Sequence, residues 1–219
     1  MRRSRMVGGA FVVEVWMAGI TPLLEEKKAL FYYQQLPPYR KQKADRQLVP
    51  LKRAQSIGVW ALWAKVKEEH GYTEEYVYNF SHSGEYVICA VETSGCKKVK
   101  LGCDIEKIRD YNHKLPERFF CESEVKRLKE EPSVQGRKEL FCRFWVLKES
   151  YLKATREGMK LDTRSFEIKL GSPSVLLKQP KEHFDYYHLC EIDFEDKEYR
   201  IGVCTTGIKI NNTLRKLLL

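Results

Sequence analysis

The sequence predicts an α+β fold built as a pseudo-dimer of two similar halves, residues 1–106 and 107–219. Helical apolar periodicity followed by strand-like segments occurs twice along the chain, in the same order. No low-complexity linker separates the halves, so we expect them to pack tightly. Residues 86–103 also resemble residues 188–204, which is either a coincidence or the trace of a repeat.

In the first half, the run FVVEVWM at residues 11–17 is rich in β-branched and aromatic residues and predicts a strand. Apolar spacing predicts a helix at residues 21–35, which the following Pro-Pro pair ends. It also predicts a basic helix at residues 39–70 that stops at Gly71. Strand patterns follow at residues 76–80, 86–91 and 99–105.

The second half is predicted to begin with helical segments at residues 116–120, 122–131 and 137–156. Strand patterns then return at residues 165–170, 175–179, 186–192 and 199–204. Residues 214–219 form too short a segment for an assignment.

The composition is that of a globular protein with free thiols. Of 219 residues, 43% are hydrophobic and 32% are charged, and no run of 18 apolar residues could cross a membrane. The early apolar stretch is interrupted by Glu14 and lacks a small-residue cleavage site, so no secretory signal is predicted. Seven cysteines without a Cys-x-x-Cys pair argue against a zinc ribbon or a disulfide framework, and favour the reducing cytoplasm.

The formal net charge of +9 predicts an anionic partner. Nucleic acid, an acidic membrane, an acidic protein and a phosphorylated small molecule all fit this charge. Part of it lies in the basic stretch from Arg40 to Arg53, which is either a solvated face or a docking surface for phosphate or an acidic helix.

Two carboxylates, Asp104 and Glu106, stand at the end of the strand predicted at residues 99–105. Alternate residues of a strand point to the same face, so the two side chains lie together. Such a pair is repulsive unless a cation lies between its members, and hard oxygen ligands suit Mg²⁺ or Mn²⁺. The alternative is a solvated strand end neutralised by Lys107 and Arg109.

The helix predicted at residues 137–156 carries three further candidates. Glu149 and Lys153 are spaced i,i+4 and lie together away from the apolar face, either as an ordinary surface ion pair or as part of a site. Lys148 falls beside the apolar face, where a lysine either extends its amine to solvent or reaches an anion in a cleft.

The segment N-F-S-H-S-G at residues 79–84 combines small hydroxyls, a histidine and a glycine between two predicted strands. A turn of this composition can bind phosphate through its side chains and backbone N–H groups. The alternative is a plain β-turn with an exposed histidine.

The order and spacing of these motifs resemble the 4′-phosphopantetheinyl transferases, in particular the two-domain, surfactin-synthetase-activating type. The matching motifs are N-F-S-H-S-G (79–84), G-C-D-I-E-K (102–107) and F-W-V-L-K-E-S-Y-L-K (144–153), and R-F-F-C-E-S-E (118–124) is similar to a fourth. The resemblance implies two similar α+β halves, each a small, mainly antiparallel sheet packed on a long helix. It also implies an active site at their interface.

The same resemblance implies an enzyme, a holo-[acyl-carrier-protein] synthase. It would transfer the phosphopantetheine arm of coenzyme A to a serine of an apo acyl or peptidyl carrier protein and release 3′,5′-ADP. We therefore expect coenzyme A and a carrier protein as partners, with no nucleic acid and no membrane. The internal repeat favours a monomer.

The resemblance also assigns roles to individual residues. Mg²⁺, or Mn²⁺, would be held by Asp104, Glu106 and Glu149. Glu149 would take the proton of the attacking serine, and Lys153 would stabilise the leaving phosphate. Coenzyme A would be contacted by Arg40, Lys43, Ser56, Ser81, His82, Asp104, Lys148 and Lys153.

Two features depart from the family pattern. The G-K-P segment that frames adenine is missing before residue 79, and an arginine common in the basic helix is Gln55 here. The missing segment favours the alternative of a catalytically degenerate homologue that binds coenzyme A or a carrier protein, whereas the intact set of carboxylates and lysines argues against it. A further alternative is a basic nucleic-acid-binding protein, whose DNA binding would depend steeply on salt.

Overall fold

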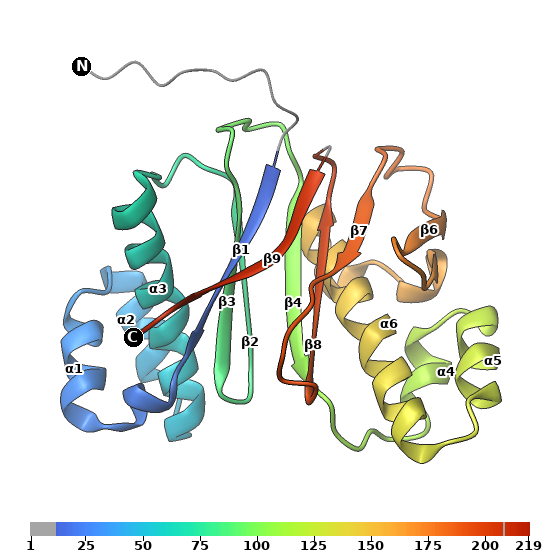
Figure 1. Cartoon of the computed structure of the whole chain (residues 1–219), viewed down its shortest axis with the longest axis horizontal. Coiled ribbons are helices and arrows are strands. Elements are labelled where there is room, and N and C mark those ends of the chain that lie inside the picture. The colour runs from blue at the N-terminus through green and yellow to red at the C-terminus, as the bar shows by residue number, and fades with distance from the viewer. Residues whose placement is uncertain (1–11, 208) are drawn as a thin grey trace.

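The computed structural model describes residues 12–207 and 209–219. It contains two main sheets that lie side by side, each with a long helix on its outer side (Figure 1). The mixed α+β fold class expected from the sequence is confirmed. No helix in the described ranges is both long and apolar enough to span a membrane. The seven cysteines, all within these ranges, are free.

The elements follow the predicted order closely. The first half contains β1 (Val12–Gly19), the 3-10 turn η1 (Thr21–Leu24), α1 (Glu26–Gln34), α2 (Pro38–Asp45), α3 (Pro50–His70), β2 (Tyr78–Ser83) and β3 (Tyr86–Glu92). The second half contains β4 (Leu101–Lys107), α4 (Leu115–Phe119), α5 (Glu122–Glu130), α6 (Val134–Thr155), η2 (Gly158–Lys160), η3 (Thr163–Ser165), β5 (Glu167–Lys169), β6 (Val175–Lys178), β7 (His188–Glu191), β8 (Tyr199–Thr205) and β9 (Lys209–Leu217).

The two main sheets are arranged similarly in part. The first has the strand order β2-β3-β1-β9 and the second has the order β4-β8-β7. In the first sheet the hairpin β2-β3 lies beside β1, and in the second the hairpin β7-β8 lies beside β4. All neighbours in these sheets are antiparallel except β1 and β9, because β9 returns from the second half to run parallel with β1.

This arrangement bears on two sequence expectations. The boundary between residues 106 and 107 stays a prediction; it falls at the end of β4, which pairs along its whole length with β8 of the second sheet. The sheets divide within residues 93–100. The likeness of residues 86–103 to residues 188–204 pairs β3 with β7, whereas the strand orders place β3 and β8 in similar positions, so the likeness does not follow the strand arrangement.

Three element predictions also differ from the structure. The basic helix predicted at residues 39–70 is two helices, because Pro50 lacks the N–H that a helix interior needs and instead opens α3. The segment expected as a turn at residues 79–84 lies mostly on β2. Strand β9 covers most of the unassigned C-terminal segment.

Two glycines bring α6 against the second sheet. A Cβ atom on Gly102 would lie 2.0 Å from the Ser150 carbonyl oxygen, and one on Gly202 would lie 2.7 Å from that of Val146. Such close approach is possible only where the strand has no side chain. It places the second half of α6 directly beside β4, the strand that carries Asp104 and Glu106.

Candidate active site

Asp104 lies where the first sheet meets the second, between the edge strands β2 and β4. Its side chain is only 6% exposed. Its Oδ1 atom accepts a hydrogen bond of 2.7 Å from Ser81 Oγ on β2 and one of 2.8 Å from Lys153 Nζ on α6. Its Oδ2 atom is buried and has no hydrogen-bond partner. Two strands and one helix, from both halves, therefore meet at this carboxylate.

Glu106 repeats the arrangement two residues further along β4. Its Oε2 atom accepts a hydrogen bond of 2.8 Å from Ser83 Oγ, also on β2. Burial, and then the negative charge of Asp104, raise the pKa of this carboxyl. Sequence reasoning missed Ser83, although its spacing from Ser81 matches the spacing of the two carboxylates on β4.

Glu149 and Lys153 both face this seam from α6, but they are not an ion pair with each other. Lys153 Nζ donates to Asp104 and to the Cys103 carbonyl oxygen, at 2.8 and 2.9 Å. Within the described ranges no hydrogen bond or ion pair involves Glu149. Burial, and then the charge of Asp104, raise the pKa of Glu149. Burial lowers the pKa of Lys153, but the charge and hydrogen bond of Asp104, together with Cys103 and Glu149, outweigh it, so the pKa of Lys153 is raised.

The three carboxylates are candidate ligands for a cation. In the ranges described, no three His, Cys, Asp or Glu side chains stand in metal-binding geometry. However, Asp104 leaves a buried oxygen unpartnered, and burial, followed by the charge of Asp104, raises the pKa of both Glu106 and Glu149. Uncompensated negative charge on hard oxygen donors fits a divalent cation such as Mg²⁺.

A basic region flanks the carboxylates on the side of α2 and α3. His82, the residue between the two serines, is exposed at the surface. Partial desolvation, followed by the charges of Lys52, Lys153 and Lys43, lowers the pKa of His82 to about 4. The imidazole is therefore neutral at physiological pH and lies among three ammonium groups. Lys52 was not among the predicted contact residues.

Polar atoms without partners occur in the same region. Arg40 donates from Nη2 to the Ser56 carbonyl oxygen at 3.1 Å, and its guanidinium lies 5.5 Å from the centre of the Trp60 ring. Its buried Nε atom and the buried Ser56 Oγ have no hydrogen-bond partner. These donors lie on α2 and α3, next to the exposed Lys43, whose pKa is lowered by desolvation and then by Arg40.

Gln55, at the position where the family resemblance implies an arginine, holds the turn after β2 in place. Its Nε2 atom donates to the Gly84 carbonyl oxygen at 2.8 Å. On the other side, the Glu85 backbone N–H donates to the Tyr199 hydroxyl at 3.2 Å. Gly84 has φ +51° and lies against the Tyr199 hydroxyl, so no larger residue fits there. α3 and β8 thus fix the turn that follows Ser81 and Ser83.

Lys148 does not lie with the other predicted residues, and its predicted contact with the diphosphate is not supported. Its side chain is 2% exposed. The ammonium group donates to the carbonyl oxygens of Thr163 and Phe166, at 2.8 and 3.0 Å, and forms an ion pair of 2.9 Å with Glu124. All three donors are used. The Lys148–Glu124 pair ties α5 and the chain after α6 to the core of the second half.

Comparison with known proteins places these motifs in a family. Residues 100–204 match the 4′-phosphopantetheinyl transferase superfamily. A 4′-phosphopantetheinyl transferase of Bacillus subtilis is 31% identical over 129 residues, which are 58% of this chain and 54% of that protein. The gsp 4′-phosphopantetheinyl transferase of Aneurinibacillus migulanus is 36% identical over 106 residues, 48% of this chain and 42% of that protein. The chain thus spans about half the length of the relatives it matches.

Among solved structures, the holo-[acyl-carrier-protein] synthase of Thermotoga maritima is similar with a TM-score of 0.41 and 20% identity. That similarity covers 50% of this chain and 63% of the synthase. The superfamily match contains Asp104, Glu106, Glu149 and Lys153, the four side chains that meet at the seam. Through this region the chain is similar to the 4′-phosphopantetheinyl transferase superfamily, the family that its motifs resemble.

Proposed function

We propose that this protein transfers the 4′-phosphopantetheine group of coenzyme A to a serine of an apo acyl or peptidyl carrier protein and releases 3′,5′-ADP. The observation that carries the proposal is the buried Asp104 carboxylate at the seam. Lys153 binds one of its oxygens, and the other has no partner. The matched relatives are named for this type of transfer.

The acidic residues of the seam would hold the cation and move the proton. Asp104, Glu106 and Glu149 would bind Mg²⁺ or Mn²⁺, which when bound would neutralise charge on the diphosphate of coenzyme A. Glu149 would also accept the proton of the attacking serine hydroxyl. Its raised pKa supports this role, because a general base works best when its pKa lies near the operating pH.

The bond changes are those of a phosphoryl transfer. The serine oxygen forms a bond to the phosphorus that carries pantetheine, and the bond from that phosphorus to the bridging oxygen breaks. The 3′,5′-ADP leaves with the electron pair. Lys153, kept charged by Asp104, would stabilise the negative charge that develops on the leaving phosphate.

The basic region beside the seam would hold the remainder of the donor. Arg40, Lys43 and Ser56 would bind the 3′-phosphate and the nucleoside, with unused polar atoms on Arg40 and Ser56 in support. Ser81 and His82 would contact the phosphates, and neutral His82 would do so as a hydrogen-bond donor. We leave Lys148 out of this set, because its three donors are already used.

We further propose that the two halves act as a pseudo-dimer with its active site at their interface. One chain supplies both sides of the seam, since Ser81 and Ser83 lie on β2 and the carboxylates lie on β4 and α6. A monomer is therefore sufficient for the reaction. Seven free cysteines fit a reducing cytoplasm as the compartment.

The test is the intact mass of an apo carrier protein after incubation with this protein, coenzyme A and Mg²⁺. We expect a mass gain of one phosphopantetheine group that EDTA abolishes. The matched pair of variants is Asp104→Asn at the seam and Asp193→Asn, an exposed carboxylate elsewhere. Coenzyme A binding without any mass gain across several carrier proteins would favour the degenerate binding homologue.

A further inference from the structure

Strands β2 and β4 lie next to each other at the seam, although they belong to different sheets. In these two strands, which the structure describes in full, polar side chains at alternate positions of β2 make the connection. Asn79 Oδ1 accepts a hydrogen bond of 3.1 Å from the Cys103 backbone N–H, and Ser83 Oγ accepts one of 3.1 Å from that of Lys107. Ser81, between them, donates to the carboxylate of the candidate site. The alignment of β2 with β4 therefore depends on single side-chain contacts rather than on a backbone ladder.

Contacts of this kind fix the register of two strands only weakly. Register is strongly specified where a strand buries an apolar face, and weakly where its side chains are small and polar. The positions of β2 that face β4 are an asparagine and two serines. A shift of β2 along β4 would move the two serines away from Asp104 and Glu106. An additional contact between the two sheets would prevent this shift.

Tyr199 makes such a contact at the end of both strands. Its backbone pairs with Lys107, the last residue of β4, in the ladder between β4 and β8. Its hydroxyl reaches the turn that follows β2, where it accepts a hydrogen bond of 3.2 Å from the Glu85 backbone N–H and donates to the Glu85 carboxylate. Tyr199 is 2% exposed. One buried side chain thus connects the end of β4 with the turn after β2.

The turn is shaped to receive the tyrosine. A Cβ atom on Gly84 would lie 2.1 Å from the Tyr199 hydroxyl oxygen. Lys107 Nζ lies 5.5 Å from the centre of the Tyr199 ring and forms an ion pair of 3.5 Å with Glu85. The hydrogen bond from Tyr199 lowers the pKa of Glu85, and burial, followed by this bond, raises the pKa of Tyr199 to about 12. The tyrosine therefore remains a donor, and the glutamate an acceptor, at physiological pH.

We propose that Tyr199 is a positioning residue for the transfer reaction, because its hydroxyl holds the turn after β2 and so keeps the two serines of β2 opposite the two carboxylates of β4. The inference rests on the proposed function and adds to it a residue that lies outside the motifs. Tyr199 acts through Glu85 and the serines, without touching coenzyme A or the cation. Its hydroxyl should therefore affect how well the carboxylates hold a cation and how fast transfer occurs.

The test is Tyr199→Phe, which removes the hydroxyl alone and leaves the ring in place. This variant should weaken Mn²⁺ binding in the presence of coenzyme A by about tenfold, measured by EPR of the free ion, and lower kcat for transfer by a similar factor. The KM for the carrier protein should stay unchanged. The control is Tyr33→Phe, which removes a hydroxyl that binds the Asp45 carboxylate at 2.8 Å between α1 and α2, and it should change neither Mn²⁺ affinity nor kcat.

Two variants of Glu85 test whether the tyrosine acts through the turn. Glu85→Gln keeps a side-chain oxygen for the Tyr199 hydroxyl and should stay within about twofold of wild type in both measurements. Glu85→Ala removes this acceptor and should reproduce most of the loss seen in Tyr199→Phe. The double variant should lose no more than Tyr199→Phe alone, because residues that act through one contact are not additive. Full additivity of the two losses would overturn the role of Tyr199.

The outcomes distinguish the role of Tyr199 from the proposed function. A lower Tm for Tyr199→Phe, with wild-type Mn²⁺ affinity and wild-type kcat per folded molecule, would overturn the role, because the tyrosine would then only stabilise the fold. If wild type transfers nothing to any carrier protein, the proposed function fails and the Mn²⁺ measurement decides on Tyr199. Weaker binding in the variant would then support its role, and equal binding would overturn it. A wild type that neither binds Mn²⁺ nor transfers would contradict both.

Discussion

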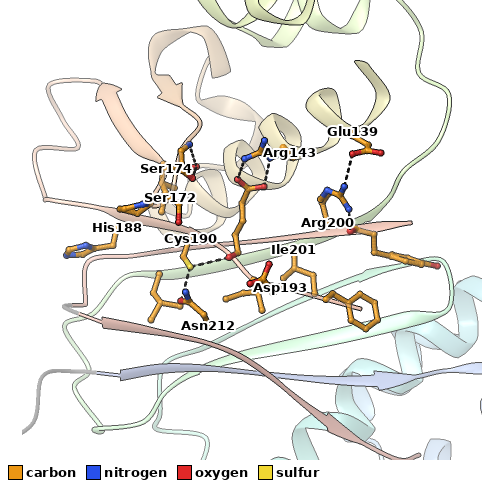
Figure 2. Close-up of a pocket in the computed structure, with 18 of the residues that line it drawn as sticks. Glu139, Arg143, Ser172, Ser174, His188, Cys190, Asp193, Arg200, Ile201 and Asn212 are labelled. Atoms are coloured by element: carbon orange, nitrogen blue, oxygen red, sulfur yellow. Dashed lines mark hydrogen bonds and ion pairs between the residues drawn. The ribbon is translucent and has the colours of Figure 1, made fainter. Parts of the chain in front are cut away.

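The two sheets meet along two seams, and the two seams differ in how their charges are balanced. At the first seam, β2 meets β4, and three carboxylates share one close lysine. At the second, β7 approaches β9, and a groove of about 670 Å³ lies beside them (Figure 2). Figure 2 shows that Arg143 and Arg200, which line this groove, are each paired with a carboxylate.

The arginines that line this groove are satisfied by neighbouring carboxylates. Arg143 binds Glu191 through two hydrogen bonds of 2.8 Å, and Arg200 binds Glu139 at 3.0 Å. At the first seam, by contrast, Asp104 has an unpartnered oxygen and raises the pKa of its neighbours. Unbalanced charge, rather than cavity volume, distinguishes the seam suited to chemistry.

The largest difference is expected from removing one carboxylate at each seam. Asp104→Asn should lower the rate of transfer by about 10³-fold or more. The variant removes a negative charge from the proposed cation site and leaves Lys153 without its charge partner. Asp193→Asn, beside the groove at the second seam, should leave the rate unchanged. Mass spectrometry of the carrier protein measures both rates, and thermal melts confirm that both variants fold. Equal losses would contradict the distinction between the seams.

A second pair of variants should change stability in opposite directions. The raised pKa of Glu149 means that its charged form is disfavoured in the folded state, and this cost is present at neutral pH. Glu149→Gln should therefore raise Tm at neutral pH, while transfer falls by about 10²- to 10³-fold. The gain in Tm should fade as pH falls below the ordinary pKa of glutamate, where both states are protonated.

Glu191→Gln is the matched change at the second seam. It removes the partner of Arg143, whose pKa is raised chiefly by its hydrogen bonds to Glu191. Tm should fall, with a loss of about 1 kcal/mol since both side chains are partly exposed. Transfer should stay near the wild-type rate. A rise in Tm for Glu191→Gln, or a fall for Glu149→Gln, would contradict the conclusion that Glu191 is a stabilising ion-pair partner and that Glu149 carries a destabilising charge.

Two lysines of α6 allow the comparison to be made within one helix. Lys153→Met should lower transfer by about 10²-fold because it removes the cation at Asp104, and it should also lower Tm because the buried Asp104 carboxylate loses its charge partner. Lys148→Met leaves Glu124 buried without its charge partner, so the free energy of unfolding should fall by about 3–5 kcal/mol. Its effect on transfer per folded molecule should be far smaller. If Lys148→Met instead raised the KM for coenzyme A at unchanged Tm, the contact expected from the sequence would be right.

The motif residues could be predicted because their spacing is local. Asp104 and Glu106 lie on one face of a strand, and Glu149 and Lys153 lie one turn apart on a helix. Only the family resemblance predicted that the pair on β4 and the pair on α6 lie close together, because periodicity describes each element alone. The two pairs are brought together by the packing of α6 against Gly102, which is a contact between segments distant in the sequence.

The features that sequence reasoning missed depend on distant partners. Lys148 lies beside the apolar face as predicted, but only its contacts with Glu124 and the chain after α6 decide that the amine is buried. Strand β9 is largely exposed and polar, and its pairing with β1 defines it. Ser83 gains its role from β2 lying beside β4.

The smallest effect is expected at His82. This residue tests whether an imidazole within the basic region beside the seam is neutral. Its pKa of about 4 means that its charge does not change between pH 5 and 8. His82→Asn keeps a hydrogen-bond donor, so it should raise the KM for coenzyme A by less than about tenfold. The pH profile of kcat/KM over that interval should keep its shape in the variant. Loss of an inflection near pH 6.5 would show that the imidazole is protonated in the working enzyme, and that the surrounding lysines do not hold it neutral.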